Sequence, residues 1–83
     1  MLFFVYILKS TKDNKFYIGQ TNNLEKRLLR HNSGKVTATR NRRPFVLAYK
    51  ETYASRAEAM QREKYLKSLK GDLERKLNVH FEN

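Results

Sequence analysis

The chain has 83 residues, a length that suits one hydrophobic core rather than two, and 40% of them are hydrophobic, which argues against disorder. The absence of cysteine excludes disulfides and thiolate zinc sites and fits an intracellular protein. Eighteen lysines and arginines against eight acidic residues give a net charge of +10, which favours nucleic acid as the partner.

The first predicted element is the apolar run from Leu2 to Leu8, whose aromatic and β-branched residues predict a strand covered on both faces. The run is too short to span a membrane, and no basic segment precedes it as in a signal peptide. We therefore expect a cytoplasmic protein without a membrane partner.

A second strand is predicted from Lys15 to Gln20, after a polar turn at residues 10–14. The two strands are expected to form a hairpin, in which side chains alternate between the two faces. Tyr6 and Tyr17 then share a face if they lie opposite each other.

A helix is predicted next, from about Leu24 to Ser33. Asn22, followed by a glutamate three residues later, has the spacing of a capping box, and Gly34 is placed to end the helix. Arg27 and His31 are four residues apart at the edge of its apolar stripe, so their side chains can reach the same site.

The segment from Lys35 to Arg43 is basic and almost free of apolar residues, which predicts a loop, and a third strand follows from Phe45 to Thr52. Basic side chains of such a loop are expected to contact the backbone of a nucleic acid. The expected contact residues are Lys35, Arg40, Arg42 and Arg43.

A second helix is predicted to begin at Ser55, which has a glutamate three residues later, and to end near Leu69. Glu63 lies in the apolar line of this helix, where a carboxylate needs a cationic or metal partner. Beyond Gly71, Asp72 is predicted to cap a last short helix.

Four short segments stand in order along the chain: Val5-Tyr6-Ile7, Tyr17-Ile18-Gly19, Asn23 to Leu28 with His31-Asn32 behind it, and Arg62-Glu63-Lys64. In their order and spacing they resemble the GIY-YIG nuclease family, and in particular its small free-standing members. The resemblance covers roughly Phe3 to Leu69. It implies an α/β domain with a small three-stranded antiparallel sheet flanked by helices.

The resemblance also implies a function, a metal-dependent endonuclease that hydrolyses phosphodiester bonds in nucleic acid, in DNA more than in RNA. The implied cofactor is Mg²⁺ or Mn²⁺, held by Glu63. Arg27 would be the catalytic arginine, and His31 would support the site. The remaining matches are the paired active-site tyrosines, Tyr6 and Tyr17, and the structural Gly19.

These implied roles agree with the chemistry of hydrolysis, which needs a base for water and positive charge on the phosphate. Arg27 could donate to two phosphate oxygens at once. Mg²⁺ usually takes one or two carboxylates together with the substrate phosphate, which suits Glu63. One of the tyrosines, its pKa lowered from the usual value of about 10 by nearby cations, would take the proton from water.

The chain departs from the family pattern at three positions. Phe4 replaces the glycine that opens the first motif, and Gln20 stands where some relatives have a lysine that helps to activate a tyrosine. Asn78 is the nearest match to a late asparagine of the family and is left out of the predicted site.

Two other functions stay open, and the sequence does not reveal whether a protein partner takes part. A binding module of the same fold without catalysis would hold nucleic acid by charge, and Gln20 and the missing late asparagine favour it. An interaction protein for an acidic partner or a membrane surface would show no preference for nucleic acid over other polyanions. The site residues also have ordinary structural uses, as strand aromatics, as a hydrogen-bonding helix histidine and as a solvated arginine.

Overall fold

The computed structural model describes the backbone of residues 1–82 and the side chains of residues 1–76. Within this part of the chain, three strands, three α-helices and one short 3-10 helix follow each other. Their bounds are β1 (Phe3–Ser10), β2 (Phe16–Thr21), α1 (Leu24–Asn32), η1 (Arg40–Arg42), β3 (Phe45–Tyr53), α2 (Arg56–Ser68) and α3 (Lys70–Glu82).

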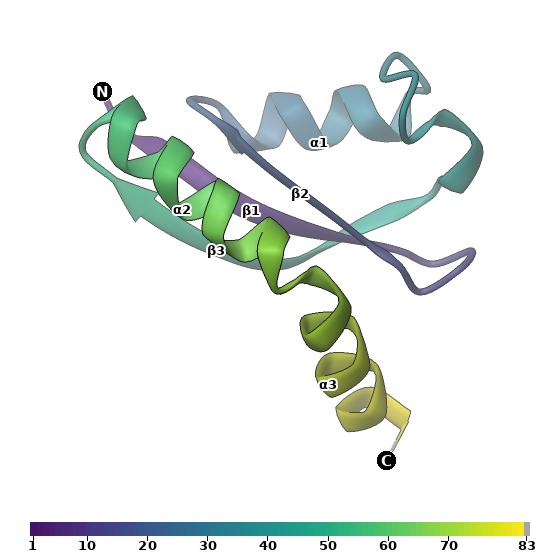
Figure 1. The fold of residues 1–83 in the computed structure, drawn as a ribbon. Coiled ribbons are helices and arrows are strands. Elements are labelled where there is room, and N and C mark those ends of the chain that lie inside the picture. The colour runs from purple at the N-terminus through teal and green to yellow at the C-terminus, as the bar shows by residue number, and fades with distance from the viewer. Residues whose placement is uncertain (83) are drawn as a thin grey trace.

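The strands form one antiparallel sheet, in which β1 lies between β2 and β3 (Figure 1). Residues Val5 to Leu8 of β1 are buried, because neighbouring strands cover both edges of β1 and helices cover both faces. The predicted α/β fold, a small three-stranded antiparallel sheet flanked by helices, is confirmed.

The register of the first hairpin offsets the two tyrosines. Tyr6 pairs with Gly19, and Tyr17 pairs with Leu8, so the tyrosines do not lie directly opposite each other. They nevertheless share a face, because a displacement of two residues is one full repeat of side-chain alternation. Glycine opposite Tyr6 leaves room for its ring above β2, which favours this register.

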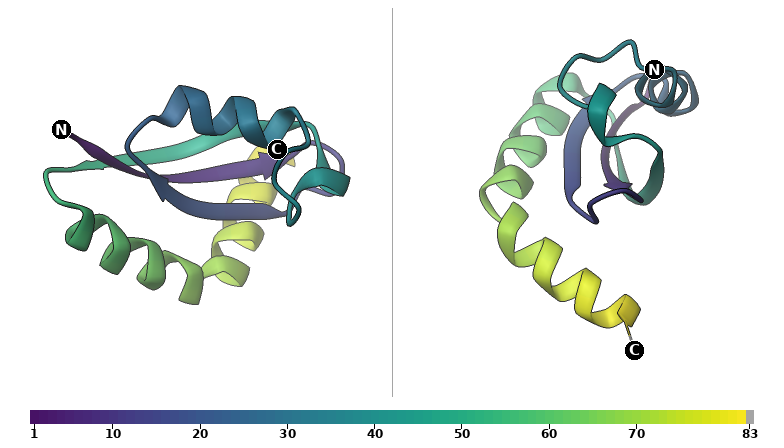
Figure 2. Two further views of the ribbon diagram at one scale, coloured as in Figure 1. Left: turned by 90° about the horizontal axis from the view of Figure 1, so that it is seen from above. Right: turned by 90° about the vertical axis from the view of Figure 1, so that its right-hand side faces the viewer.

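Side-chain alternation divides the interior into two cores, one on each face of the sheet. Figure 2 shows α1 on one side of the sheet and α2 on the other. The core under α2 contains Val5, Ile7, Phe16, Ile18, Ala59 and Leu66. The core on the α1 side contains Tyr6, Leu8 and Phe45, with Tyr17, Leu24 and Leu28 packed against it.

The cap of α1 is Asn23 rather than the predicted Asn22. The side chain of Asn23 accepts the backbone N–H of Lys26 at 3.0 Å. The hydroxyl of Thr21, the last residue of β2, accepts the N–H of Asn23 and so stabilises the turn that leads into this cap. Gly34, with φ of 83°, follows the helix as the predicted terminator.

The second helix begins at the predicted cap, since the Ser55 hydroxyl accepts the backbone N–H of Glu58. Its C-cap is Leu69, close to the predicted end. A last helix is present as predicted, but its predicted start was wrong, because α3 begins at Lys70 and holds Gly71 and Asp72 within its first turn.

Tertiary contacts explain why α3 continues through a glycine. Leu73 packs against the core under α2, and the Glu74 carboxylate accepts the backbone N–H of Phe16 at 2.6 Å. The far end of α3 extends away from the sheet (Figure 1). Within the described residues, none of the helices is long and apolar enough to cross a membrane.

Candidate active site

Tyr6 lies in the middle of β1 on the face covered by α1 and is 1% exposed. Its ring crosses β2 directly above Gly19. A Cβ atom at position 19 would lie 2.5 Å from the tyrosine oxygen and 2.7 Å from Cζ. The glycine is therefore required by the close approach of the Tyr6 ring.

His31 lies in the last turn of α1 and is completely buried. Its Nε2 is 3.2 Å from the Tyr6 hydroxyl oxygen, and its Nδ1 is 2.9 Å from Oγ1 of Thr39. Burial, followed by the charges of Arg27 and Arg30, lowers the pKa of His31 to about 4. The imidazole is therefore neutral at neutral pH.

Tyr17 lies against the same imidazole from β2 and is half-buried. The ring centroids of Tyr17 and His31 are 4.7 Å apart, and the Tyr6 ring meets His31 edge-on at 6.1 Å. The structure therefore brings both predicted tyrosines to the predicted histidine.

Arg27 is one turn before His31 on the same helix, and its guanidinium faces the Tyr6 hydroxyl. Its buried Nε has no hydrogen-bond partner within the described part of the chain. An unpaired buried donor costs about 1–3 kcal/mol, so this N–H suits an oxygen of a ligand. A small pocket beside it is lined by Thr21, Asn22, Asn23, Lys26, Arg27 and Arg30.

The pKa of Tyr6 is raised above its usual value of 10, mainly because burial disfavours the phenolate. The neighbouring Arg27 opposes this rise, whereas Tyr17 and Glu63 add to it. For Tyr6, the expectation of a lowered tyrosine pKa was wrong, because desolvation outweighs the cation.

Glu63 comes from α2, on the opposite face of the sheet from α1 (Figure 2). Its side chain is 20% exposed, and its Oε2 is 2.7 Å from Nζ of Lys67. Lys67 is therefore a cationic partner of the kind expected for a carboxylate in the apolar line of the helix. The negative charge of Glu63 still contributes to the raised pKa of Tyr6. The carboxylate therefore acts electrostatically on the cluster formed by Tyr6, Tyr17, Arg27 and His31. The side chain of Asn78 lies outside the described residues.

The basic segment after α1 contains the 3-10 helix η1, and its four predicted contact residues divide into two pairs. Lys35 and Arg40 are exposed. Arg42 forms an ion pair with Asp13, with Nε 3.2 Å from Oδ2, and Arg43 donates its Nε–H to the Arg40 carbonyl at 2.8 Å. Arg42 and Arg43 therefore support the loop itself.

Thr39, in the same segment, contacts the cluster and was not predicted to do so. Its side chain is completely buried against His31. A threonine within a basic run has the sequence pattern of an ordinary loop residue. Only the fold, which returns the loop to the end of α1, reveals the contact.

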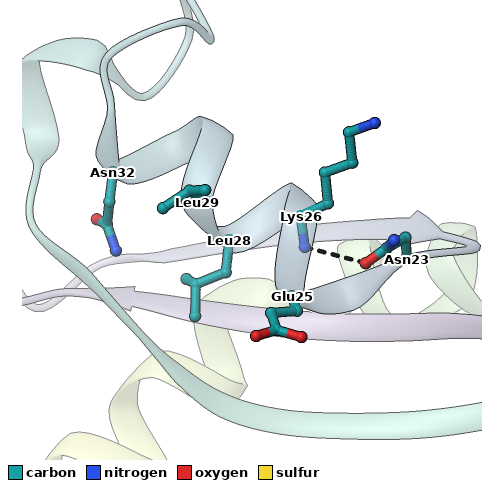
Figure 3. Close-up of a pocket in the computed structure, with 6 residues that line it drawn as sticks. All are labelled: Asn23, Glu25, Lys26, Leu28, Leu29 and Asn32. Atoms are coloured by element: carbon teal, nitrogen blue, oxygen red, sulfur yellow. Dashed lines mark hydrogen bonds between the residues drawn. The ribbon is translucent and has the colours of Figure 1, made fainter.

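A shallow pocket lies along α1, apart from this cluster (Figure 3). None of the predicted site residues lines it. Its lining residues are Asn23, Glu25, Lys26, Leu28, Leu29 and Asn32.

Comparison with known proteins identifies the family. The family model of the GIY-YIG catalytic domain matches residues 2–78. The UPF0213 protein SH2523 of Staphylococcus haemolyticus is 48% identical over 66 residues, which cover 78% of this chain and 79% of that protein. The UPF0213 protein YazA of Bacillus subtilis is 46% identical over 67 residues, which cover 80% of this chain and 67% of that protein.

A solved structure has the same fold, the solution NMR structure of the UPF0213 protein BH0048 from Bacillus halodurans. It is 36% identical in sequence, and its TM-score is 0.56, with 95% of this chain and 84% of that chain covered. The solved structure and the family match therefore agree with the three-stranded antiparallel sheet and its flanking helices. The chain belongs to the GIY-YIG catalytic domain family, a family of nucleases.

Proposed function

We propose that this protein is a divalent-metal-dependent endonuclease that hydrolyses phosphodiester bonds in nucleic acid. The proposal is supported by the contact between Tyr6 and His31 beside Arg27, because a hydrogen-bonded hydroxyl and imidazole next to a cation would be able to pass a proton. Membership of the family and the net charge of +10 support the substrate class.

In this proposal Arg27 binds the phosphate that is cut. Its guanidinium stays charged, and its buried Nε–H, unpaired among the described residues, would donate to a phosphate oxygen as negative charge develops. Lys26 and Arg30 line the same pocket and would hold the phosphates on either side.

Tyr6 takes the proton of the attacking water. Because its pKa is raised, it reacts as the phenol: its oxygen accepts the water proton while its own proton passes to Nε2 of neutral His31. The water oxygen bonds to phosphorus as the bond to the leaving oxygen breaks, and solvent protonates the leaving oxygen. Tyr17 packs on the imidazole and shields it from solvent.

Glu63 would hold Mg²⁺ or Mn²⁺. A carboxylate is a ligand that these hard cations prefer, and a single one suffices when water and the substrate phosphate supply the other ligands. Lys67 would release its ion pair with this carboxylate. When bound, the cation would neutralise charge on the phosphate.

The nucleic-acid surface would extend from the Arg27 pocket to the exposed Lys35 and Arg40. Arg42 and Arg43, also predicted to contact the backbone, would hold the loop in shape and add their charge. DNA is proposed ahead of RNA, as the resemblance to the GIY-YIG nucleases implies.

The test is cleavage of labelled duplex, single-stranded and branched DNA and of RNA, in Mg²⁺, Mn²⁺ or EDTA. The wild-type protein and Glu25→Gln, a control on the exposed start of α1, are expected to cleave in the presence of metal. Glu63→Gln is expected to lose about 100-fold or more of the rate. Equal cleavage by Glu63→Gln would contradict the metal role.

The ion pair between Glu63 and Lys67 favours a second candidate, a nucleic-acid-binding module without catalysis, because the carboxylate already has a cationic partner. This candidate predicts tight, salt-sensitive binding that EDTA and Glu63→Gln leave unchanged, with no cleavage by either protein.

A further inference from the structure

Thr39 and His31 form a buried contact beside the Tyr6 hydroxyl. Both side chains are completely buried, and Oγ1 of Thr39 lies 2.9 Å from Nδ1 of His31. The same hydroxyl also lies 3.4 Å from the backbone carbonyl of Val36, which already accepts the Thr39 N–H at 3.1 Å.

The Val36 carbonyl fixes the direction of these hydrogen bonds. A carbonyl can only accept, so the Thr39 hydroxyl donates to it, and the lone pairs of the hydroxyl then accept the Nδ1–H of His31. A neutral imidazole has one N–H, so Nε2 is unprotonated and accepts a hydrogen bond from the Tyr6 hydroxyl. Tyr6 thus donates to His31, His31 donates to Thr39, and Thr39 donates to the Val36 carbonyl.

We propose that Thr39 is a positioning residue that holds His31 in the Nδ1–H tautomer, so that Tyr6 points its proton toward His31 and its lone pairs toward Arg27 and the substrate. The inference rests on the proposed function. In the reaction, the proton from water arrives on Tyr6, the proton of Tyr6 moves to Nε2, and the resulting imidazolium donates Nδ1–H to Thr39.

The opposite tautomer would block this transfer. With the proton on Nε2, His31 would donate to the Tyr6 oxygen and occupy the lone pair that must receive the proton from water. The loop at residues 35–43 carries Thr39, so a correctly folded loop is a condition for the correct tautomer.

The tautomer of His31 is measurable without substrate, by long-range ¹H–¹⁵N NMR at neutral pH. A His80→Gln variant assigns the signals, because the chain contains two histidines. The wild-type protein is expected to show protonated Nδ1 and bare Nε2. Protonated Nε2 in the wild-type protein overturns the proposal.

Thr39→Val removes the hydroxyl and keeps the shape of the side chain, whereas Thr39→Ser keeps the hydroxyl. Thr37→Val, at an exposed position of the same loop, is the matched control. Thr39→Val is expected to shift His31 to the Nε2–H tautomer and to lower cleavage about 10- to 100-fold. Thr39→Ser and Thr37→Val are expected to keep the wild-type tautomer and most of the activity.

An unchanged tautomer in folded Thr39→Val, or a changed tautomer in Thr39→Ser, overturns the positioning role. If Thr39→Val does not fold, the wild-type and Thr39→Ser spectra still decide the tautomer. If the wild-type protein cleaves no substrate while Thr39→Val shifts the tautomer, the proposed function fails and the positioning of His31 by Thr39 stands.

Discussion

At the scale of single residues, the site depends on close contacts between side chains from separate elements. Tyr6 comes from β1, His31 from α1, and Gly19 from β2 provides the space in which the tyrosine ring lies. Both the packing of this ring and the protonation of the imidazole depend on these contacts.

Gly19→Ala is expected to displace the Tyr6 ring, because the new Cβ would lie 2.5 Å from its oxygen. The free energy of unfolding should fall by about 1–3 kcal/mol, as for other overpacked cores, and the cleavage rate should fall with it. Urea unfolding measures the first effect. Gly71→Ala is the control: nothing lies near its Cβ, and alanine in a helix should add about 0.5–1 kcal/mol of stability. Equal stability of Gly19→Ala and wild type would contradict the close contact.

His31 is expected to make folding sensitive to mild acid. The unfolded chain binds this proton near the ordinary pKa of 6.5, whereas the folded protein binds it only near 4. The contribution of neutral His31 to the free energy of unfolding is therefore complete above pH 6.5. About 2–3 kcal/mol of it is lost as the pH falls toward 4. The check is the difference between wild type and His31→Gln in urea unfolding across this range. A measured His31 pKa near 6.5 in the folded protein would contradict the prediction.

At the scale of elements, side-chain hydrogen bonds connect the helices to the strands. The amide of Asn32, at the end of α1, pairs with both backbone groups of Phe45 at the start of β3, with distances of 3.0 and 2.7 Å. Arg62 of α2 donates two hydrogen bonds to the Glu51 carboxylate on β3, at 2.8 and 2.9 Å. These contacts hold a helix on each face of the sheet.

Glu51→Gln is expected to lower the free energy of unfolding by about 2 kcal/mol, because it removes charge-assisted hydrogen bonds. Hydrogen bonds from Arg62, and then from Tyr49 and Tyr53, lower the pKa of Glu51 to about 2. Its contribution is therefore present above pH 4.5 and is lost as the pH falls toward 2, below the range of His31. Chemical unfolding at pH 7 and pH 3 tests both statements. Glu25→Gln should change stability little, and a similar small effect of Glu51→Gln would contradict the role of the pair.

The elements were largely predictable from sequence because their signals are local. The aromatic run of β1, the Ser55 cap and Gly34 each act over a few residues, and the structure has them as predicted. The hairpin register and the start of α3 were not predictable in this way. They depend on the Tyr6 ring above β2 and on Leu73 and Glu74 docking onto distant strands.

The candidate site was predictable through the spacing of its motifs rather than through any single residue. Tyr6, Tyr17, Arg27 and His31 do come together around the imidazole. The direction of the Tyr6 pKa shift and the contact of Thr39 could not be predicted, because both depend on burial in the folded protein.

At the scale of the whole molecule, the net charge of +10 implies binding to nucleic acid that weakens steeply with salt. Arg40→Gln is expected to lower the slope of log affinity against log salt by about 1, as for the loss of one phosphate contact. Arg75→Gln, on the part of the chain that extends away from α1 (Figure 1), should leave the slope unchanged. Fluorescence anisotropy at several salt concentrations makes the comparison, and equal slopes for both variants would place the binding surface elsewhere.

The roles of Tyr6 and His31 are tested most directly by the single-turnover cleavage rate of Tyr6→Phe. The comparisons are wild type and Tyr65→Phe, a control at an exposed tyrosine of α2. Phenylalanine keeps the ring above Gly19 and removes the hydroxyl that contacts His31. A loss of about 100-fold or more, with folding and affinity for nucleic acid retained, is the predicted result. Cleavage by Tyr6→Phe at the wild-type rate would contradict the assignment of the active site to Tyr6 and His31.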